Sequence, residues 1–288
     1  MATSSALGIL DAVQNNSVEC GHTAGFYYLG KESALVFDTG VPFGLTPRQQ
    51  HAWMNYGGGL ELMRDVYSKF NIIQFPAGNT GAQMGGWFRK KINNLNDLKG
   101  LRIRSPGLVG QVYAKLGAIP QQIPGGEIYT SMDKGTIDAV EWVGPYDDEK
   151  LGLNKVAKFY YGPGVMELNA SLSLLVNKQA WEALPVPYRA VLQSACSEAS
   201  IDMLAKYDAL NIPALKRIVG GGVQLSTWPT EVMRGMQKAA DEVLDDNATK
   251  NPLFAKILSN FKSFQKDQLL WNSINDTAAE RFLQQKKS

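Results

Sequence analysis

The sequence predicts an α/β fold whose final third is helical. Up to about residue 170, short apolar segments with strand character alternate with helical patterns, and glycine and proline separate them. This alternation is typical of α/β proteins and predicts a largely parallel sheet. After residue 177 the strand pattern gives way to apolar residues at helical spacing.

Four short apolar or alternating segments predict strands, at residues 34–37, 72–75, 101–104 and 137–142. Between them, residues 107–116 carry apolar side chains at helical spacing and stop at Gly117, which suits the position after a helix end. Residues 127–134 predict a shorter helix, which Gly135 ends. Strands and helices therefore follow one another with short connections.

The last third predicts three helical regions. Pro187 suits the first turn of a helix. The apolar residues that follow it at spacings of three and four are Tyr188, Val191, Leu192, Ala195, Cys196 and Ala199. Cys196 falls on this face, so we interpret it as a core residue. Thr230 is an N-cap candidate for the next helix, and residues 253–282 predict another helical region, broken near Asp267.

The composition excludes several classes of protein. The chain has 288 residues, of which 44% are hydrophobic and 19% charged, so it is long and apolar enough to form a folded core. Its 29 basic and 27 acidic residues give a net charge of +2, which argues against a nucleic acid partner. No apolar run approaches the roughly 18 to 20 residues that span a bilayer. Residues 1–5 lack the features of a secretory signal.

Signatures of common enzyme classes are missing from the sequence. There is no phosphate-binding P-loop, no Gly-x-Ser-x-Gly and no His-Glu-x-x-His. The glycines at 57–59 predict a turn before a helix over residues 60–70, not a dinucleotide site. His22 follows Cys20 closely, but a turn with a hydrogen-bonded ring is the simpler interpretation. The two cysteines are too few for a disulfide framework.

Two arginines alternate on the predicted strand at 101–104. Arg102 and Arg104 would share one face of the strand, and Arg104 stands at its carboxyl end. Ligands of open α/β sheets bind at that edge, and a guanidinium matches a carboxylate with two parallel hydrogen bonds. An ordinary salt bridge, to Asp97 for example, is the alternative.

Uncharged amides and two carboxylates form the other candidate groups. Asn79 and Gln83 lie in a glycine-rich loop after the strand at 72–75, and could bind ligand oxygens or a hard cation, or could merely cap the loop backbone. Glu141 ends an apolar strand, and Glu167 follows in a later loop. This pair could ligate a cation, act as acid and base of a hydrolase, or form ion pairs with lysines such as Lys150.

The ordered motifs resemble one known family, the extracytoplasmic solute receptors of TRAP transporters (the DctP family). The pattern is most similar to the branch that binds 2-oxo acids and related hydroxy acids such as lactate. The resemblance covers nearly the whole chain and rests on residues 11–14, 21–28, 79–88, 97–104, 135–145 and 176–185. It implies a receptor without catalytic turnover, in the periplasm.

The resemblance implies a ligand site. The arginine that holds the ligand carboxylate falls on Arg104. The ligand-contacting tyrosine falls on Tyr27 or Tyr28, with Tyr27 preferred, and Asn79 and Trp87 would also line the pocket.

A bound cation, usually sodium and alternatively calcium, is implied as well. Its ligands would be Gln83, Glu141, Glu167 and the main-chain carbonyl of Trp142. Gln83 and Trp142 would also contact the ligand.

The fold that the resemblance implies is a two-lobed, type II periplasmic-binding-protein fold with a long helical C-terminal region. We expect the first lobe in residues 1–82 and 170–210, the second in 83–169, and helices packing on both lobes in 211–288. The family's first strand and helix have no counterpart before residue 6. Expected partners are the TRAP permease subunits and a second copy, bound through the C-terminal helix. The alternatives are a hydrolase and a ligand sensor without a permease.

Overall fold

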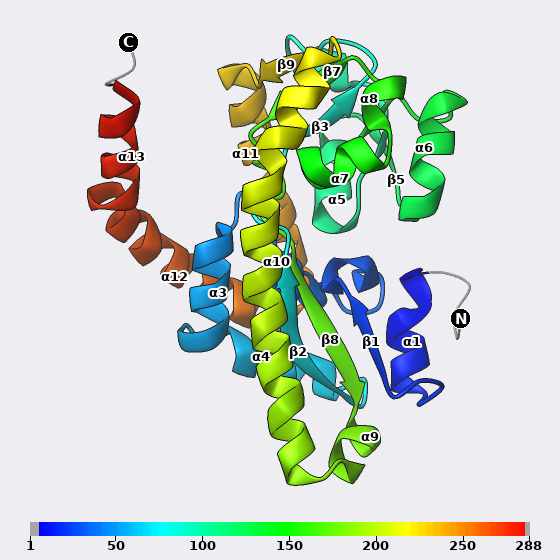
Figure 1. Cartoon of the computed structure of the whole chain (residues 1–288), viewed down its shortest axis with the longest axis vertical. Coiled ribbons are helices and arrows are strands. Elements are labelled where there is room, and N and C mark those ends of the chain that lie inside the picture. Colours follow the sequence, from blue (N-terminus) through cyan, green and yellow to red (C-terminus); the bar gives the residue numbers. More distant parts are fainter. Residues whose placement is uncertain (1–5, 286–288) are drawn as a thin grey trace.

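The computed structural model describes residues 6–285, which fold around two β-sheets (Figure 1). The first sheet is antiparallel in the order β1-β8-β2, with β1 at Cys20–Thr23, β2 at Ile72–Asn79 and β8 at Ser171–Asn177. His22, expected in a turn, lies on β1, and its ring donates to the Ala77 carbonyl at 3.1 Å.

The second sheet is mixed. Its order is β5-β4-β6-β3-β7-β9, and its strands are β3 (Gly86–Phe88), β4 (Arg102–Arg104), β5 (Ile119–Gln121), β6 (Ala139–Val140), β7 (Phe159–Gly162) and β9 (Gln224–Thr227). β4 is parallel to β5 and β6, whereas β3 is antiparallel to both of its neighbours. The prediction of a largely parallel sheet is therefore wrong. β3 enters directly from the first sheet through a loop, without the helical crossover that makes strands parallel.

Short helices connect these strands. They are η1 (Ala6–Gly8), α1 (Ile9–Gln14), η2 (Gly25–Tyr28), η3 (Ser33–Leu35), α2 (Val36–Thr39), α3 (Pro47–Tyr56), α4 (Gly59–Ser68), η4 (Leu95–Leu98), α5 (Gly107–Lys115), α6 (Gly125–Asp133), α7 (Pro145–Lys150), α8 (Leu153–Val156) and α9 (Lys178–Ala183). α5 and α6 confirm two predicted helices, and Gly117 and Gly135 behind them take positive φ values of 87° and 71°.

The strand expected at residues 34–37 is wrong, because this segment is the helical turn of η3 and α2. Its four side chains are fully buried. A run that is buried on every side has no alternation, so its sequence does not distinguish a strand from a helix. The strand expected at 137–142 is confirmed only as the two residues of β6.

Long helices dominate the C-terminal third: α10 (Val186–Gly220), α11 (Thr230–Lys250), α12 (Pro252–Ile274) and α13 (Asp276–Gln285). α10 runs alongside both sheets, while α12 and α13 lead away from them (Figure 1). The apolar face predicted for α10 is only partly buried. Cys196 packs against β2 and β8, but Tyr188 and Val191 are exposed. α12 runs through Asp267 and ends at Ile274, so the break, at Asn275, lies eight residues later than predicted. The strand β9 interrupts the region expected to be helical.

Candidate functional site

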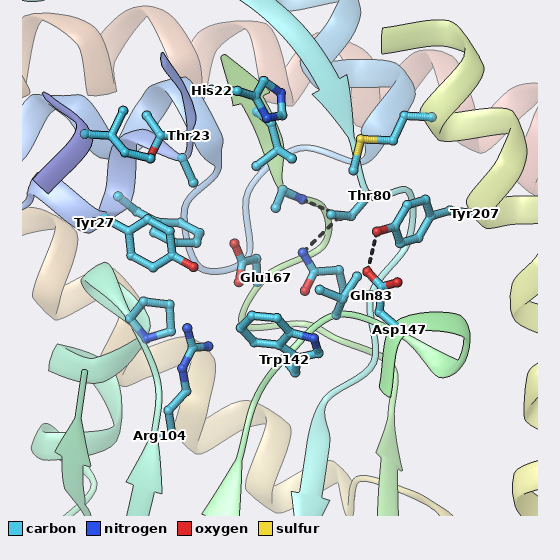
Figure 2. Close-up of a pocket in the computed structure, with 18 residues that line it drawn as sticks. His22, Thr23, Tyr27, Thr80, Gln83, Arg104, Trp142, Asp147, Glu167 and Tyr207 are labelled. Atoms are coloured by element: carbon cyan, nitrogen blue, oxygen red, sulfur yellow. Dashed lines mark hydrogen bonds between the residues drawn. The ribbon is translucent and has the colours of Figure 1, made fainter. Parts of the chain in front are cut away.

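A cavity of about 260 Å³ lies between segments of the two sheets (Figure 2). Of the residues predicted for the site, Tyr27, Gln83, Arg104, Trp142 and Glu167 line it. Tyr27 comes from η2, next to the first sheet, whereas Arg104 ends β4 of the second sheet. The cavity thus collects most of the predicted residues, from segments far apart in the sequence.

Arg104 is 2% exposed and is fixed by the main chain. Its Nε donates to the Ile123 carbonyl at 3.2 Å and its Nη1 to the Glu141 carbonyl at 2.9 Å. The guanidinium lies 4.9 Å from the centre of the Trp142 ring, a cation–π distance. Within residues 6–285, no carboxylate forms a salt bridge with it. Arg104 is therefore a buried cation whose remaining N–H groups are available to an anionic ligand.

Glu141 and Glu167 form a buried pair of carboxylates next to Arg104. Glu141 directly follows β6, and its N–H donates to the Arg104 carbonyl at 3.1 Å. Burial raises the pKa of Glu141, against the opposing effect of the Arg104 charge. Burial and the Glu141 charge hold the pKa of Glu167 well above its usual value. One oxygen of each carboxylate has no hydrogen-bond partner. Such a pair requires a shared proton or a cation.

A glycine permits the close approach of strands behind this pair. Gly86 has a φ of 109°, and a Cβ at this position would lie 2.6 Å from the Val140 carbonyl oxygen. Only glycine therefore lets β3 lie this close to the segment that carries Glu141.

Gln83 and the Trp142 carbonyl meet at the cavity wall. In one orientation the Gln83 amide nitrogen donates to Thr80 Oγ1 at 3.0 Å, and the amide oxygen faces the Trp142 carbonyl oxygen. In the swapped orientation the nitrogen donates to that carbonyl at 2.9 Å. The swapped orientation satisfies the protein without a cation. In the unswapped orientation, the Gln83 amide oxygen and the Trp142 carbonyl oxygen face each other, as two ligands of one cation would.

These donors fit a hard cation. The set contains two carboxylates, an amide oxygen and a main-chain carbonyl, which are the ligand types of sodium and calcium. The unpartnered oxygens of Glu141 and Glu167 are the observation in favour of this fit. Within residues 6–285, no three His, Cys, Asp or Glu side chains cluster as a metal site, so the amide and the carbonyl are needed.

Tyr27 and Tyr28 differ in their surroundings. Tyr27 lines the cavity; burial raises the pKa of its hydroxyl, and the nearby Arg104 charge opposes this shift. Tyr28 is 2% exposed, and its hydroxyl forms a 2.7 Å hydrogen bond with Thr23 Oγ1. The geometry agrees with the preference for Tyr27.

Asn79 and Trp87 do not line the cavity, contrary to expectation. Asn79 donates to Asn169 Oδ1 at 2.8 Å and accepts from the Gly81 N–H at 2.9 Å, so it shapes the loop that carries Gln83. Trp87 is fully buried in the core of the second sheet, where its Nε1 donates to Asp148 at 2.8 Å. All three residues of β3 are buried, so a three-residue sequence pattern does not reveal which face of the strand points to the cavity.

Two of the cavity residues that were not predicted from the sequence form a polar pair. Asp147 of α7 and Tyr207 of α10 line the cavity and form a hydrogen bond with each other. Figure 2 shows this pair on the side of the cavity opposite Tyr27 and Arg104. Tyr207 lies on a helix for which the sequence predicts a packing role. Its contact with Asp147 depends on the fold and has no local sequence signal.

The geometry does not suit a carboxylate-pair hydrolase. Glu141 and Glu167 are close enough to share a hydrogen bond. Glycoside hydrolases need a separation of about 5 to 9.5 Å, so that the sugar or a water fits between the two groups.

Comparisons with known proteins agree with this interpretation. Residues 4–251 match the model of the DctP family, described as bacterial extracellular solute-binding protein, family 7. The monocarboxylate 2-oxoacid-binding periplasmic protein of Nostoc sp. (strain PCC 7120) is 51% identical over 276 residues, which are 96% of this chain and 76% of that protein.

Two solved structures are similar along most of their length. A TRAP transporter solute-binding protein from Bordetella bronchiseptica, a dimer with copurified calcium and picolinate, has a TM-score of 0.95 and 49% identity, over 96% of this chain and 82% of its own. One from Pseudoalteromonas atlantica, with bound sodium and pyruvate, has a TM-score of 0.93 and 42% identity, over 96% and 84%. The two-lobed, type II-like fold is thereby confirmed.

Two further predictions concern membrane-spanning segments and catalysis. Within residues 6–285, no helix has the length and apolarity needed to cross a membrane. The matched family consists of solute-binding proteins, not enzymes. The chain belongs to the DctP family of bacterial extracellular solute-binding proteins.

Proposed function

We propose that the chain is a TRAP receptor that captures a 2-oxo monocarboxylate, such as pyruvate, together with sodium or calcium. One observation carries the proposal. Among the described residues, Arg104 is a buried arginine without a salt bridge, and it lies next to two buried carboxylates that each leave one oxygen without a hydrogen-bond partner. Arg104 and one of these carboxylates, Glu167, line the same cavity. A ligand carboxylate would pair with Arg104 through two parallel hydrogen bonds, and Tyr27 would donate to the ligand. The relatives with pyruvate or a 2-oxoacid in their descriptions support this substrate class.

Gln83, Glu141, Glu167 and the Trp142 carbonyl would hold the cation. A bound cation would supply the positive charge that offsets the two carboxylates, which otherwise repel an anionic ligand. The residues themselves orient the ligand: Arg104 fixes its carboxylate from one side, and the burial of the site excludes competing water.

The charges of the cavity favour a single carboxylate. Arg104 is the one lysine or arginine among the described residues that line it. The far end carries the carboxylate of Asp147, whose nearest cation is the exposed Lys150 at 3.5 Å. A second ligand carboxylate would approach Asp147 and be repelled. Most of the wall between the two ends is apolar, and consists of Ile9, Ala24, Phe26, Pro106, Val143, Ala170, Leu172 and Met203.

The ligand would couple the two lobes. The lobe boundaries at 82/83 and 169/170 fall in loops, after β2 and before β8. Tyr27 and Arg104 come from different lobes, so a ligand that contacts both stabilises the closed form. Gln122 already donates to the Tyr27 carbonyl across the cleft at 3.3 Å. The permease subunits would recognise this closed form in the periplasm.

Calorimetry with pyruvate tests the binding. We expect saturable binding in sodium buffer, and weaker binding in sodium-free buffer with a chelator. No binding of pyruvate, lactate or longer 2-oxo acids under either condition would contradict the proposal. Sodium-driven uptake in vesicles that contain the permease would distinguish transport from sensing.

We also propose that the chain dimerises through its C-terminal helices. α12 and α13 lead away from both sheets (Figure 1), and α12 exposes a run of large apolar side chains: Leu269 (59%), Leu270 (68%), Trp271 (54%) and Ile274 (68%). Such a surface is typical of an interface. The Bordetella bronchiseptica relative is a dimer. We expect a dimer in sedimentation velocity and a monomer for Leu270→Asp; a native monomer at micromolar concentration would refute this.

A further inference from the structure

The peptide group between Trp142 and Val143 has both of its polar atoms engaged. Its carbonyl oxygen faces the Gln83 amide in the candidate cation site. Its N–H, which is the N–H of Val143, donates to Asp148 Oδ1 at 3.2 Å. The C=O and N–H of a trans peptide point in opposite directions within one plane. A fixed acceptor for the N–H therefore also fixes the direction of the carbonyl.

Asp148 is itself held rigidly. It is 1% exposed, and its Oδ2 accepts from Trp87 Nε1 at 2.8 Å and from the Tyr160 hydroxyl at 2.7 Å. The Trp87 and Tyr160 rings are fully buried and stack with their centroids 4.0 Å apart. They lie on the paired strands β3 and β7. A continuous set of contacts thus connects the core of the second sheet to the Trp142 carbonyl.

The Asp148 carboxylate acts on the same carbonyl. Within residues 6–285 no lysine or arginine forms a salt bridge with it, and burial raises its pKa to about 7. In its ionised form, its hydrogen bond to Val143 is charge-assisted. A hydrogen bond at the N–H of a peptide polarises the group and places more negative charge on its oxygen. Outer partners of this kind orient metal ligands and increase their basicity.

We propose that Asp148 is a positioning residue for the cation of this receptor. It orients and polarises the Trp142 carbonyl without contacting cation or ligand, and Trp87 and Tyr160 hold it in place. This inference rests on the proposed function, since it concerns the cation that accompanies the 2-oxo acid. It also gives Trp87, which does not reach the cavity, a role in the site.

Asp148→Asn tests the proposal, because asparagine keeps the volume but loses the charge and one acceptor. The measurement is the sodium concentration that gives half-maximal pyruvate binding. We expect it to rise about 10- to 100-fold, the range typical for loss of an outer partner of a metal ligand. At saturating sodium, pyruvate affinity should return to within about threefold of native. Thermal unfolding without ligands checks that the variant is fully folded at the assay temperature, because a folded variant that is merely less stable would keep the native sodium dependence.

Asp38→Asn is the matched control. Asp38 is also a fully buried aspartate with three donors, namely the Tyr67 hydroxyl at 2.8 Å, Gln74 Nε2 at 2.5 Å and the Ser173 hydroxyl at 3.0 Å. It lies in the first lobe and does not line the cavity. We expect its replacement to lower stability and to leave the sodium dependence unchanged.

Tyr160→Phe keeps the proposal testable if Asp148→Asn does not fold. It removes one hydrogen bond to Asp148 and keeps the ring stack, so sodium dependence should shift about threefold or more. The inference is overturned if a folded Asp148→Asn variant has the native sodium dependence. If only Tyr160→Phe folds, native sodium dependence in that variant overturns it. Absence of pyruvate binding by the native protein would instead overturn the proposed function.

Discussion

Replacement of Arg104 separates charge from geometry in ligand binding. The guanidinium has five N–H hydrogens; two donate to the carbonyls of Ile123 and Glu141, and three remain for a ligand and Tyr27. Arg104→Met removes the charge and every donor but keeps most of the side-chain volume. Arg104→Lys keeps the charge but offers one nitrogen, which cannot serve both carbonyls and hold a carboxylate through two bonds.

The expected losses follow from these contacts. Truncation of one member of a buried charge pair costs about 2 to 5 kcal/mol, so Arg104→Met should weaken pyruvate binding about 30-fold to 4,000-fold. Arg104→Lys loses at least one charged hydrogen bond, worth about 1.5 to 3 kcal/mol, and should bind about 10- to 150-fold more weakly. Calorimetry in saturating sodium measures both values, with lysine the milder change.

Arg102→Met is the matched control, since Arg102 lies on the same strand. It pairs with Asp138 at 2.7 and 2.8 Å on the surface, and its side chain is 41% exposed. We expect pyruvate affinity within about threefold of native. Near-native binding by a folded Arg104→Met would refute the assignment of the ligand carboxylate, and equal binding by lysine and arginine would refute the role of the planar fork.

Three further predictions follow from other charged groups. Glu141→Gln and Glu167→Gln should abolish the sodium dependence of pyruvate binding in calorimetry; a persistent dependence would contradict their role as cation ligands. Asp147→Asn should improve 2-oxoglutarate binding relative to pyruvate by roughly tenfold, and an unchanged ratio would contradict the repulsion argument. Burial raises the pKa of Asp38 from 3.8 to about 6, so its contribution to stability is complete below pH 3.8 and is lost as pH rises through 6. Urea unfolding should therefore lose about 3 kcal/mol between pH 3.5 and pH 8 relative to Asp38→Asn, and parallel pH profiles would contradict this.

Local sequence patterns predicted several elements near their observed positions. β2, β4, α5 and α6 are examples, and positive φ values at Gly117 and Gly135 agree with the predicted stops of the two helices. Patterns failed where burial is complete or absent. Residues 34–37 are buried on every side, and Tyr188 and Val191 on α10 are exposed although their spacing is that of a buried face.

The residues of the candidate site also differ in how far the sequence predicted them. Arg104, Glu141 and Glu167 stand out in the sequence because charged residues at strand and loop ends are costly to bury without a function. Asp147 and Tyr207 have no local signal, since their meeting depends on how α10 lies against α7. The same holds for Trp87, whose assignment to the pocket followed from its motif and not from its direction.

Trp87 also shows why a motif can be informative while a residue's role within it is misjudged. In the segment at 79–88, Gln83 lines the cavity, as does Thr80, whereas Trp87 stays in the core. Both act on the same peptide group: Gln83 faces its carbonyl, while Trp87 fixes the carboxylate that binds its N–H. A substitution at either position would alter the Trp142 carbonyl, so both belong to one functional unit although only one contacts the cavity.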